Sequence, residues 1–183
     1  FVHCGYVKEI ESAVLFAKKY GLKMVLVGGT DAWRVTELLK QNNIPVVLGQ
    51  THALPAREDD DIDLPYKLPS LLHQAGVTCA ISIEGSWQER NLPFMAGTAA
   101  GHGLTSEEAL SMVTSVPAAI LGLDTQTGTL EAGKDATLLL TKGDILDMKS
   151  SVVEVAFIKG KTINLDDVQK QLNRKYMEKY GLK

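Results

Sequence analysis

The sequence contains few cysteines and no excess of basic residues. Its two cysteines, Cys4 and Cys79, lie far apart, and each falls within an apolar segment. This spacing excludes a disulfide framework and a CxxC metal motif, so we expect two packed free thiols. The net charge of -3, with basic residues spread along the chain, excludes the electrostatic footprint of a nucleic-acid-binding protein.

Long hydrophobic stretches are also absent. No apolar run approaches the roughly 20 residues that cross a bilayer, and the first residues lack the basic region and apolar core of a signal peptide. We therefore expect neither a membrane nor nucleic acid as a partner. The chain is expected to be soluble, and its compartment stays open between cytoplasm and periplasm.

Short apolar runs and helix-periodic segments alternate from residue 1 to residue 122. A content of 45% hydrophobic and 22% charged residues is that of an ordinary globular domain, so these runs can build a buried core. Apolar runs begin near positions 2, 24, 45 and 77, and each leads into a segment with helical spacing. This alternation predicts a parallel sheet covered by helices.

Local signals place helices and one long loop between these strands. A helix is expected over 9–20, where apolar residues share one face. A loop rich in acidic and turn residues, 50–66, follows the third strand, and loops of this length in compact domains are usually functional or mobile. Beyond the fourth strand, Pro93 and Thr105 mark two helix starts, since Thr105 and Glu108 have capping-box spacing.

Four β/α units amount to half of an eight-stranded barrel. They could instead form a small doubly wound domain, but an open half-barrel leaves two sheet edges that need partners. Later the chain becomes β-rich, with strands expected over 137–141 and 152–158, and a charged helix over 166–180 should pack on a neighbouring domain. The expected domains are a half-barrel over 1–122, a small β segment over 123–165 and a C-terminal helix over 166–183.

Four segments in the second half of the chain resemble a known family. In order they are Arg90–Phe94, Gly103–Leu110, Val116–Gly122 and Thr127–Leu138. They are similar to the end of the barrel, and the re-entry into the small β-domain, of imidazolonepropionase-like amidohydrolases. Gly128 and Gly133 bracket a tight turn there, where a residue without a side chain tolerates positive φ. The implied fold is α/β: the C-terminal half of a (β/α)8 TIM-type barrel, part of a small β-sandwich and a C-terminal helix.

The resemblance also implies metal-dependent chemistry. In that superfamily one or two divalent metals, often zinc, lie at the carboxyl ends of the barrel strands and activate water to hydrolyse a carbon–nitrogen bond. Histidines on strands 1, 5 and 6 and an aspartate on strand 8 are the usual participants. His3 matches the strand 5 histidine, Gly28 stands where the strand 6 ligand would be, and Glu84 follows the strand that would carry the aspartate.

The site implied by this comparison uses three side chains of the chain. His3 and His52 are expected as metal ligands, and Glu84 and His52 as catalytic groups, with zinc as the expected metal. His52 enters because it lies just beyond a strand, at the face where barrel active sites form. The alternatives are a packed strand-end histidine for His3 and an exposed loop histidine for His52. Zinc needs about three protein ligands, so the departure at Gly28 makes a ligand from outside this sequence necessary.

Other polar residues have plainer interpretations. His73 and His102 are expected at the surface or at helix ends, and the acidic run 58–61 with Asp63 is expected to be a solvated loop rather than a cation site. Residues 28–30 after an apolar strand suggest an anion site at a helix N-terminus. They lack the full G-x-G-x-x-G pattern and a Walker lysine, so the nucleotide signature is weak.

Three hypotheses for function follow. The first is a metal-dependent amidohydrolase that hydrolyses a non-peptide carbon–nitrogen bond in a small cyclic amide or related substrate. The second is a metal-free or non-catalytic homologue that binds a small molecule or serves as a structural subunit. The third is a free-standing α/β binding domain. The first two predict that the N-terminal half of the same protein, or another copy in a homo-oligomer, closes the barrel.

Overall fold

Four short strands form one parallel sheet. They are β1 (Val2–Cys4), β2 (Leu26–Gly28), β3 (Val46–Leu48) and β4 (Cys79–Ile81). In the computed structural model, which describes residues 1–182, the strand order is β1-β2-β3-β4, and each strand pairs parallel to the next. The predicted parallel sheet is confirmed. It is an open sheet with β1 and β4 at its edges, so a closed barrel is not formed within these residues.

The helices between these strands follow the predicted alternation. They are α1 (Val7–Tyr20), the 3-10 turn η1 (Ala32–Arg34), α2 (Thr36–Gln41) and α3 (Leu64–Gln74). Helix α1 begins where the Glu9 carboxylate accepts hydrogen bonds from the backbone N–H groups of Gly5 and Tyr6, at 3.0 and 3.1 Å. It ends at Gly21, whose φ of 63° is left-handed. Helix α3 begins earlier than expected because Pro65 suits a first helical turn, so the preceding loop is shorter.

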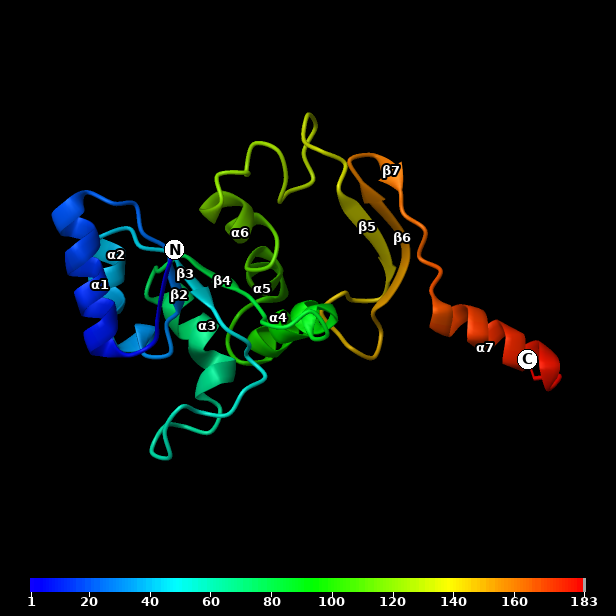
Figure 1. The fold of residues 1–183 in the computed structure, drawn as a ribbon, viewed down its shortest axis with the longest axis horizontal. Helices are drawn as coiled ribbons and strands as arrows, with labels where there is room; N and C mark the ends of the chain where they lie inside the picture. Colours follow the sequence, from blue (N-terminus) through cyan, green and yellow to red (C-terminus); the bar gives the residue numbers. More distant parts are fainter. Residues whose placement is uncertain (183) are drawn as a thin grey trace.

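Three further helices follow β4. They are α4 (Leu92–Gly101), α5 (Ser106–Ser111) and α6 (Ser115–Ile120), with a 3-10 turn, η2 (Glu89–Asn91), before them. The capping box of α5 forms as predicted: the Glu108 backbone N–H donates to the Thr105 hydroxyl at 3.2 Å, and the Thr105 N–H donates to the Glu108 carboxylate at 2.7 Å. Figure 1 shows α1 and α2 at one end of the parallel sheet and α4, α5 and α6 beyond its other end.

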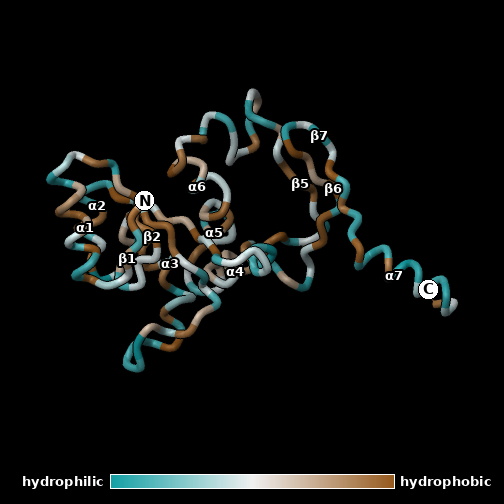
Figure 2. Tube along the Cα trace, viewed as in Figure 1, coloured by the Kyte–Doolittle hydropathy of each residue, from teal (hydrophilic) through white to brown (hydrophobic). Residues whose placement is uncertain are grey.

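The core lies between one face of the parallel sheet and the helices. Leu26 and Val46 are fully buried there together with Ile10 of α1, Leu39 of α2 and Leu72 of α3. Figure 2 shows this concentration of hydrophobic residues along β1 to β4 and a hydrophilic loop between β3 and α3. Burial of these side chains is the main stabilising contribution to the fold.

The other face of the sheet is less covered. Successive residues of a strand point to opposite faces, so His3, Val27 and Val47, which lie in register, share the face opposite to Leu26 and Val46. His3 is exposed, and Val27 and Val47 are only half-buried. The sheet therefore keeps one apolar face partly open at β1, β2 and β3.

The C-terminal third contains an antiparallel sheet. Strands β5 (Leu138–Lys142), β6 (Val152–Ile158) and β7 (Lys161–Thr162) follow one another, and β6 lies in the middle. The chain enters it through the turn that Gly128 and Gly133 form with φ of 99° and 94°, as predicted. This sheet is a single layer, so the described residues do not form a β-sandwich.

The last helix, α7 (Val168–Lys179), is more isolated. Its N-cap Asp167 accepts a hydrogen bond from the Lys170 backbone N–H at 2.8 Å. Figure 1 shows α7 extending away from the two sheets. No residue of α7 is buried, so within residues 1–182 it does not make the packing predicted for its apolar side. No helix in this part of the chain is both long and apolar enough to cross a membrane.

Candidate functional site

The carboxyl ends of the four parallel strands meet at one edge of the sheet. His3 lies in β1 at this edge, His52 lies shortly beyond β3 and Glu84 shortly beyond β4, and all three are exposed. Because β1 and β4 are separated by two strands, the strand that carries His3 and the strand that precedes Glu84 lie on the order of 14 Å apart across the sheet. The structure thus places His3 and Glu84 near the carboxyl ends of β1 and β4 and the His52 side chain against α4, without bringing the three into mutual contact.

His52 is oriented by helix α4. Its Nε2 lies 2.6 Å from the hydroxyl of Thr98, and that hydroxyl donates its proton to the carbonyl of Phe94 at 3.0 Å. When the single proton of the Thr98 hydroxyl is donated to the Phe94 carbonyl, His52 is the donor at Nε2. The Nδ1 atom of His52 is then the nitrogen that can accept a proton or bind a metal.

Gly28 adopts a conformation that other residues avoid. Its φ is 100°, and a Cβ added there would lie 3.2 Å from the carbonyl oxygen of Cys4 on the neighbouring strand. The expected strand 6 ligand position therefore carries no side chain, and its backbone is unsuited to one. No group of three or more His, Cys, Asp or Glu that could hold a metal ion occurs among residues 1–182.

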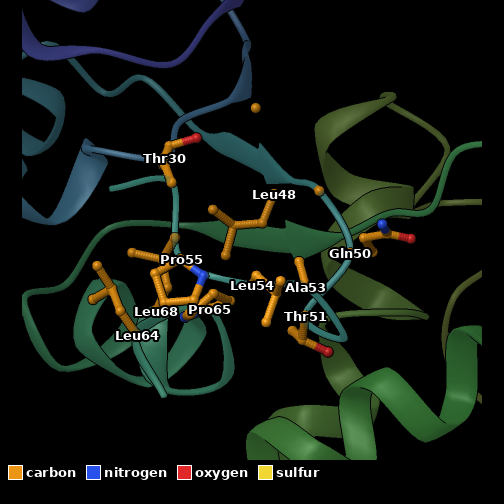
Figure 3. Close-up of a pocket in the computed structure, with 13 residues that line it drawn as sticks. Thr30, Leu48, Gln50, Thr51, Ala53, Leu54, Pro55, Leu64, Pro65 and Leu68 are labelled. Atoms are coloured by element: carbon orange, nitrogen blue, oxygen red, sulfur yellow. The ribbon is translucent and has the colours of Figure 1, made fainter. Parts of the chain in front are cut away.

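An apolar cavity opens beside this edge. It has a volume of about 190 Å³ and lies between the carboxyl ends of β2 and β3, the loop that follows β3 and the first turns of α3. Figure 3 shows Leu48, Leu64, Leu68 and Pro55 around it, with Thr30 and Gln50 at its margins. The sequence did not reveal this cavity, because its walls come from the ends of β2 and β3, the loop after β3 and α3, which no local pattern brings together.

The wall-forming loop, residues 49–63, is tied to the body by a buried carboxylate. Asp31, which is 3% exposed, accepts two hydrogen bonds from the guanidinium of Arg57 at 2.7 Å each and one from the Val7 backbone N–H at 3.3 Å. This bidentate pair of hydrogen bonds strengthens the ion pair and fixes the orientation of the Arg57 guanidinium. We call Asp31 and Arg57 the loop clasp.

Two more charges extend the clasp. The side chain of Asp60, which is 3% exposed, lies 3.7 Å from the Arg57 guanidinium and 3.5 Å from that of Arg34. The expectation of a solvated acidic loop is therefore wrong for Asp60, because the fold brings two arginines to it. Glu58 and Asp59 are exposed, as expected.

The clasp perturbs the ionisation of its members. The hydrogen bonds from Arg57 hold the pKa of the Asp31 carboxyl below its ordinary value, with further lowering by the Val7 N–H and the charge of Arg34, against the opposing effect of burial. The same contact raises the pKa of Arg57. The ion pair is therefore intact at neutral pH. The sequence signal for it was weak: an aspartate two residues after a glycine turn and an arginine before an acidic run.

The remaining histidines have structural partners. His73 lies 3.0 Å from the Glu108 carboxylate at the start of α5, and His102, at the end of α4, donates from Nδ1 to the Thr98 carbonyl at 2.7 Å. The predicted surface or helix-end positions are confirmed. Cys4 and Cys79 are both free, and burial raises the pKa of the Cys79 thiol to about 12.

Known proteins are similar to this chain in sequence and in fold. The amidohydrolase family model matches residues 2–163. An imidazolonepropionase from Flavobacterium psychrophilum is 26% identical over 193 residues, which covers 89% of this chain and 47% of the relative. The structure of an amidohydrolase from Thermotoga maritima MSB8 superposes with a TM-score of 0.80 at 31% identity, over 88% of this chain and 42% of that chain.

A more distant structure shares the fold alone. It is an adenosine deaminase from Xanthomonas campestris with bound zinc, with a TM-score of 0.58 at 18% identity, over 98% of this chain and 50% of that chain. The chain thus spans at most half of the length of these three relatives.

Proposed function

Since the chain belongs to the amidohydrolase family and is imidazolonepropionase-like, we propose that it forms part of an enzyme that hydrolyses a carbon–nitrogen bond other than a peptide bond, in a small cyclic amide or related substrate. The observation that carries this proposal is the shared edge of the parallel sheet. His3 lies in β1, His52 follows β3 and Glu84 follows β4, and enzymes built on parallel β/α units place their catalytic groups at the carboxyl ends of the strands.

We assign proton transfer to Glu84 and His52. Both side chains are exposed at the sheet edge, where a substrate can reach them. The hydrogen bond to Thr98 orients the His52 ring and leaves Nδ1 able to accept a proton. Hydrolysis of an amide needs a proton removed from water and one delivered to the departing nitrogen, and a carboxylate with an imidazole can perform both transfers.

The described residues do not by themselves fit a zinc ion. His3 and His52 are the two side chains of the chain that we propose as ligands, whereas Gly28 cannot contribute one and no cluster of three ligands occurs in residues 1–182. Zinc in proteins takes about three protein ligands. Metal dependence therefore requires ligands from outside this chain, either from a longer form of the protein or from another copy.

We propose that the same outside segment completes the sheet. The edges at β1 and β4 are open, and His3, Val27 and Val47 lie on a face that is only partly covered. Open edges and apolar faces are removed from water when further strands close a barrel. The N-terminal half of the same protein, or a second copy in a homo-oligomer, would supply those strands.

Turnover by the full-length protein tests the proposed function. Small cyclic amides and N-acyl amides are incubated with it, and the released amine or ring-opened acid is quantified. We expect turnover to fall at least about 100-fold in Glu84→Gln, because removal of a general acid or base typically costs that much. Glu89→Gln, which changes a glutamate of the nearby η2 turn, is the matched control. Absence of turnover across the panel, or equal rates for the two variants, would refute the proposal.

Gly28 favours a second candidate, a metal-free or non-catalytic homologue that binds a small molecule or acts as a structural subunit. The backbone at this position excludes the side chain that the family pattern places there. Metal analysis of the full-length protein separates the two candidates. A stoichiometric amount of zinc, iron or manganese supports the metalloenzyme, and less than about a tenth of an equivalent, unchanged by added metal, supports the homologue.

A further inference from the structure

The apolar cavity beneath the loop of residues 49–63 has no role in the chemistry assigned above, since His3, His52 and Glu84 do not line it. We propose that it is a specificity pocket that binds an apolar side group of the substrate, about the size of a leucine side chain or a phenyl ring. This inference deepens the proposed function, because it names the class of substrate: an amide that carries a compact hydrophobic group.

Size and lining define this class. The cavity holds about 190 Å³, and an apolar cavity of roughly 150 Å³ in another protein is large enough to bind benzene. Its deep wall consists of Leu48, Leu64 and Leu68, which are 2%, 6% and 8% exposed. The buried hydroxyl of Thr51 is already satisfied, because it donates to the Met95 carbonyl at 3.1 Å. A charged group would lose its hydration there without compensation, whereas an apolar group gains by leaving water.

The position of the cavity links it to the sheet edge. Its margins include Gly28 and Thr30 at the end of β2 and Gln50 after β3, so it opens where the strands end (Figure 3). Gln50 is exposed and Thr30 half-buried, and these polar side chains suit the amide of a ligand whose side group lies inside. A ligand held in this way has its amide at the carboxyl ends of β2 and β3, on the helix-covered face to which Leu48 points, whereas His3 points to the opposite face.

The clasp makes the pocket pre-organised. The loop that forms the outer wall, from Ala53 to Ala56, is followed directly by Arg57, whose guanidinium is fixed on Asp31 by two bonds of 2.7 Å. Asp31 itself is buried and also bonded to the start of α1. A wall held before the ligand arrives does not have to be ordered on binding, which improves affinity.

Binding of two amides that differ only in the side group tests the inference. The full-length protein is titrated with N-acetyl-L-leucinamide and with N-acetylglycinamide, and saturation-transfer NMR gives the two dissociation constants. We expect leucinamide to bind about tenfold more tightly or better, from burial of its isobutyl group. Methyl NMR of the wild-type protein should show leucinamide shifting the signals of Leu48 and Leu64. Equal affinities, or shifts confined to other methyl groups, would overturn the inference.

A filled pocket provides the matched comparison. Ala53→Phe places a ring at the wall of the cavity, and Ile62→Phe places the same ring on an exposed position of the same loop that does not line it. Ala53→Phe should abolish the preference for leucinamide, and Ile62→Phe should keep it. If both variants keep it, the cavity is not the site. These readouts need no turnover, so a protein that binds leucinamide in the pocket but hydrolyses no amide keeps the cavity as a binding site for apolar groups and loses the proposed function.

Discussion

The loop clasp predicts a specific response to the loss of one charge. Asp31→Asn keeps the size of the side chain but removes its negative charge. Charge-assisted hydrogen bonds contribute roughly 1.5 to 3 kcal/mol when lost. Asp31 is 3% exposed, but the Arg57 side chain is 35% exposed and is therefore partly screened by water. We therefore expect the lower end of this range, about 1.5 kcal/mol of unfolding free energy, or about 3 to 6 °C in melting temperature.

The assay resolves where this free energy is lost. Hydrogen–deuterium exchange followed by mass spectrometry should show faster exchange in residues 49–63 of Asp31→Asn, and thermal melting should give the global effect. Asp59→Asn is the matched control, because Asp59 lies exposed on the same loop and makes no ion pair among the described residues. If Asp31→Asn and Asp59→Asn exchange and melt alike, the clasp does not hold the loop.

The clasp also predicts a pH dependence with a defined sign. The folded state lowers the pKa of Asp31 below the ordinary value of 3.8. A carboxyl group with a lowered folded-state pKa contributes its full stability above its unfolded pKa and loses it as the pH falls through the folded value. The difference in hydrogen–deuterium exchange of residues 49–63 between wild type and Asp31→Asn should therefore have its full size at pH 6 and shrink below about pH 4. A difference that persists unchanged to lower pH would contradict this account.

Two further predictions concern single residues near the sheet. Gly28→Ala should lower the unfolding free energy by about 1 to 3 kcal/mol, because the φ of Gly28 is 100° and the added Cβ would meet the Cys4 carbonyl. Gly49→Ala should change the unfolding free energy little, because no atom lies near the position of the added Cβ. Equal midpoints of the two variants in chemical denaturation would contradict the strain at Gly28. Ellman's reagent at pH 8 should modify half-buried Cys4 before buried Cys79, whose pKa is raised to about 12, and simultaneous labelling of the folded protein would contradict the burial.

Local patterns accounted for much of the fold. The helix over Val7–Tyr20 and the cap at Thr105 were predictable because their signals are apolar spacing and capping residues a few positions apart. The start of α3 was less predictable. The acidic residues before Leu64 indicate a loop. Pro65 favours a helix start only when it lies in the first helical turn, and the sequence does not show where that turn begins.

The site was less predictable because its contacts join distant residues. Asp31 and Arg57 are 26 positions apart, and His52 and Thr98 are 46 apart. No periodicity connects such pairs, so the sequence showed an acidic loop and a lone histidine where the structure has a clasp and an oriented imidazole. The absence of a ligand side chain at Gly28 was visible in the sequence. Its physical reason is a backbone with positive φ that lies against the Cys4 carbonyl, and this is seen only once β1 and β2 are paired.

We propose that an enzyme containing this chain hydrolyses a carbon–nitrogen bond. The most direct measurement is turnover of an N-acyl or cyclic amide by the full-length protein in water enriched in oxygen-18, with mass spectrometry of the products. Hydrolysis should give a carboxylic acid that carries one oxygen-18 atom for each turnover, together with the released amine or its ring-opened equivalent. Substrate left intact across the amide panel, or a product without the heavy oxygen, would contradict it.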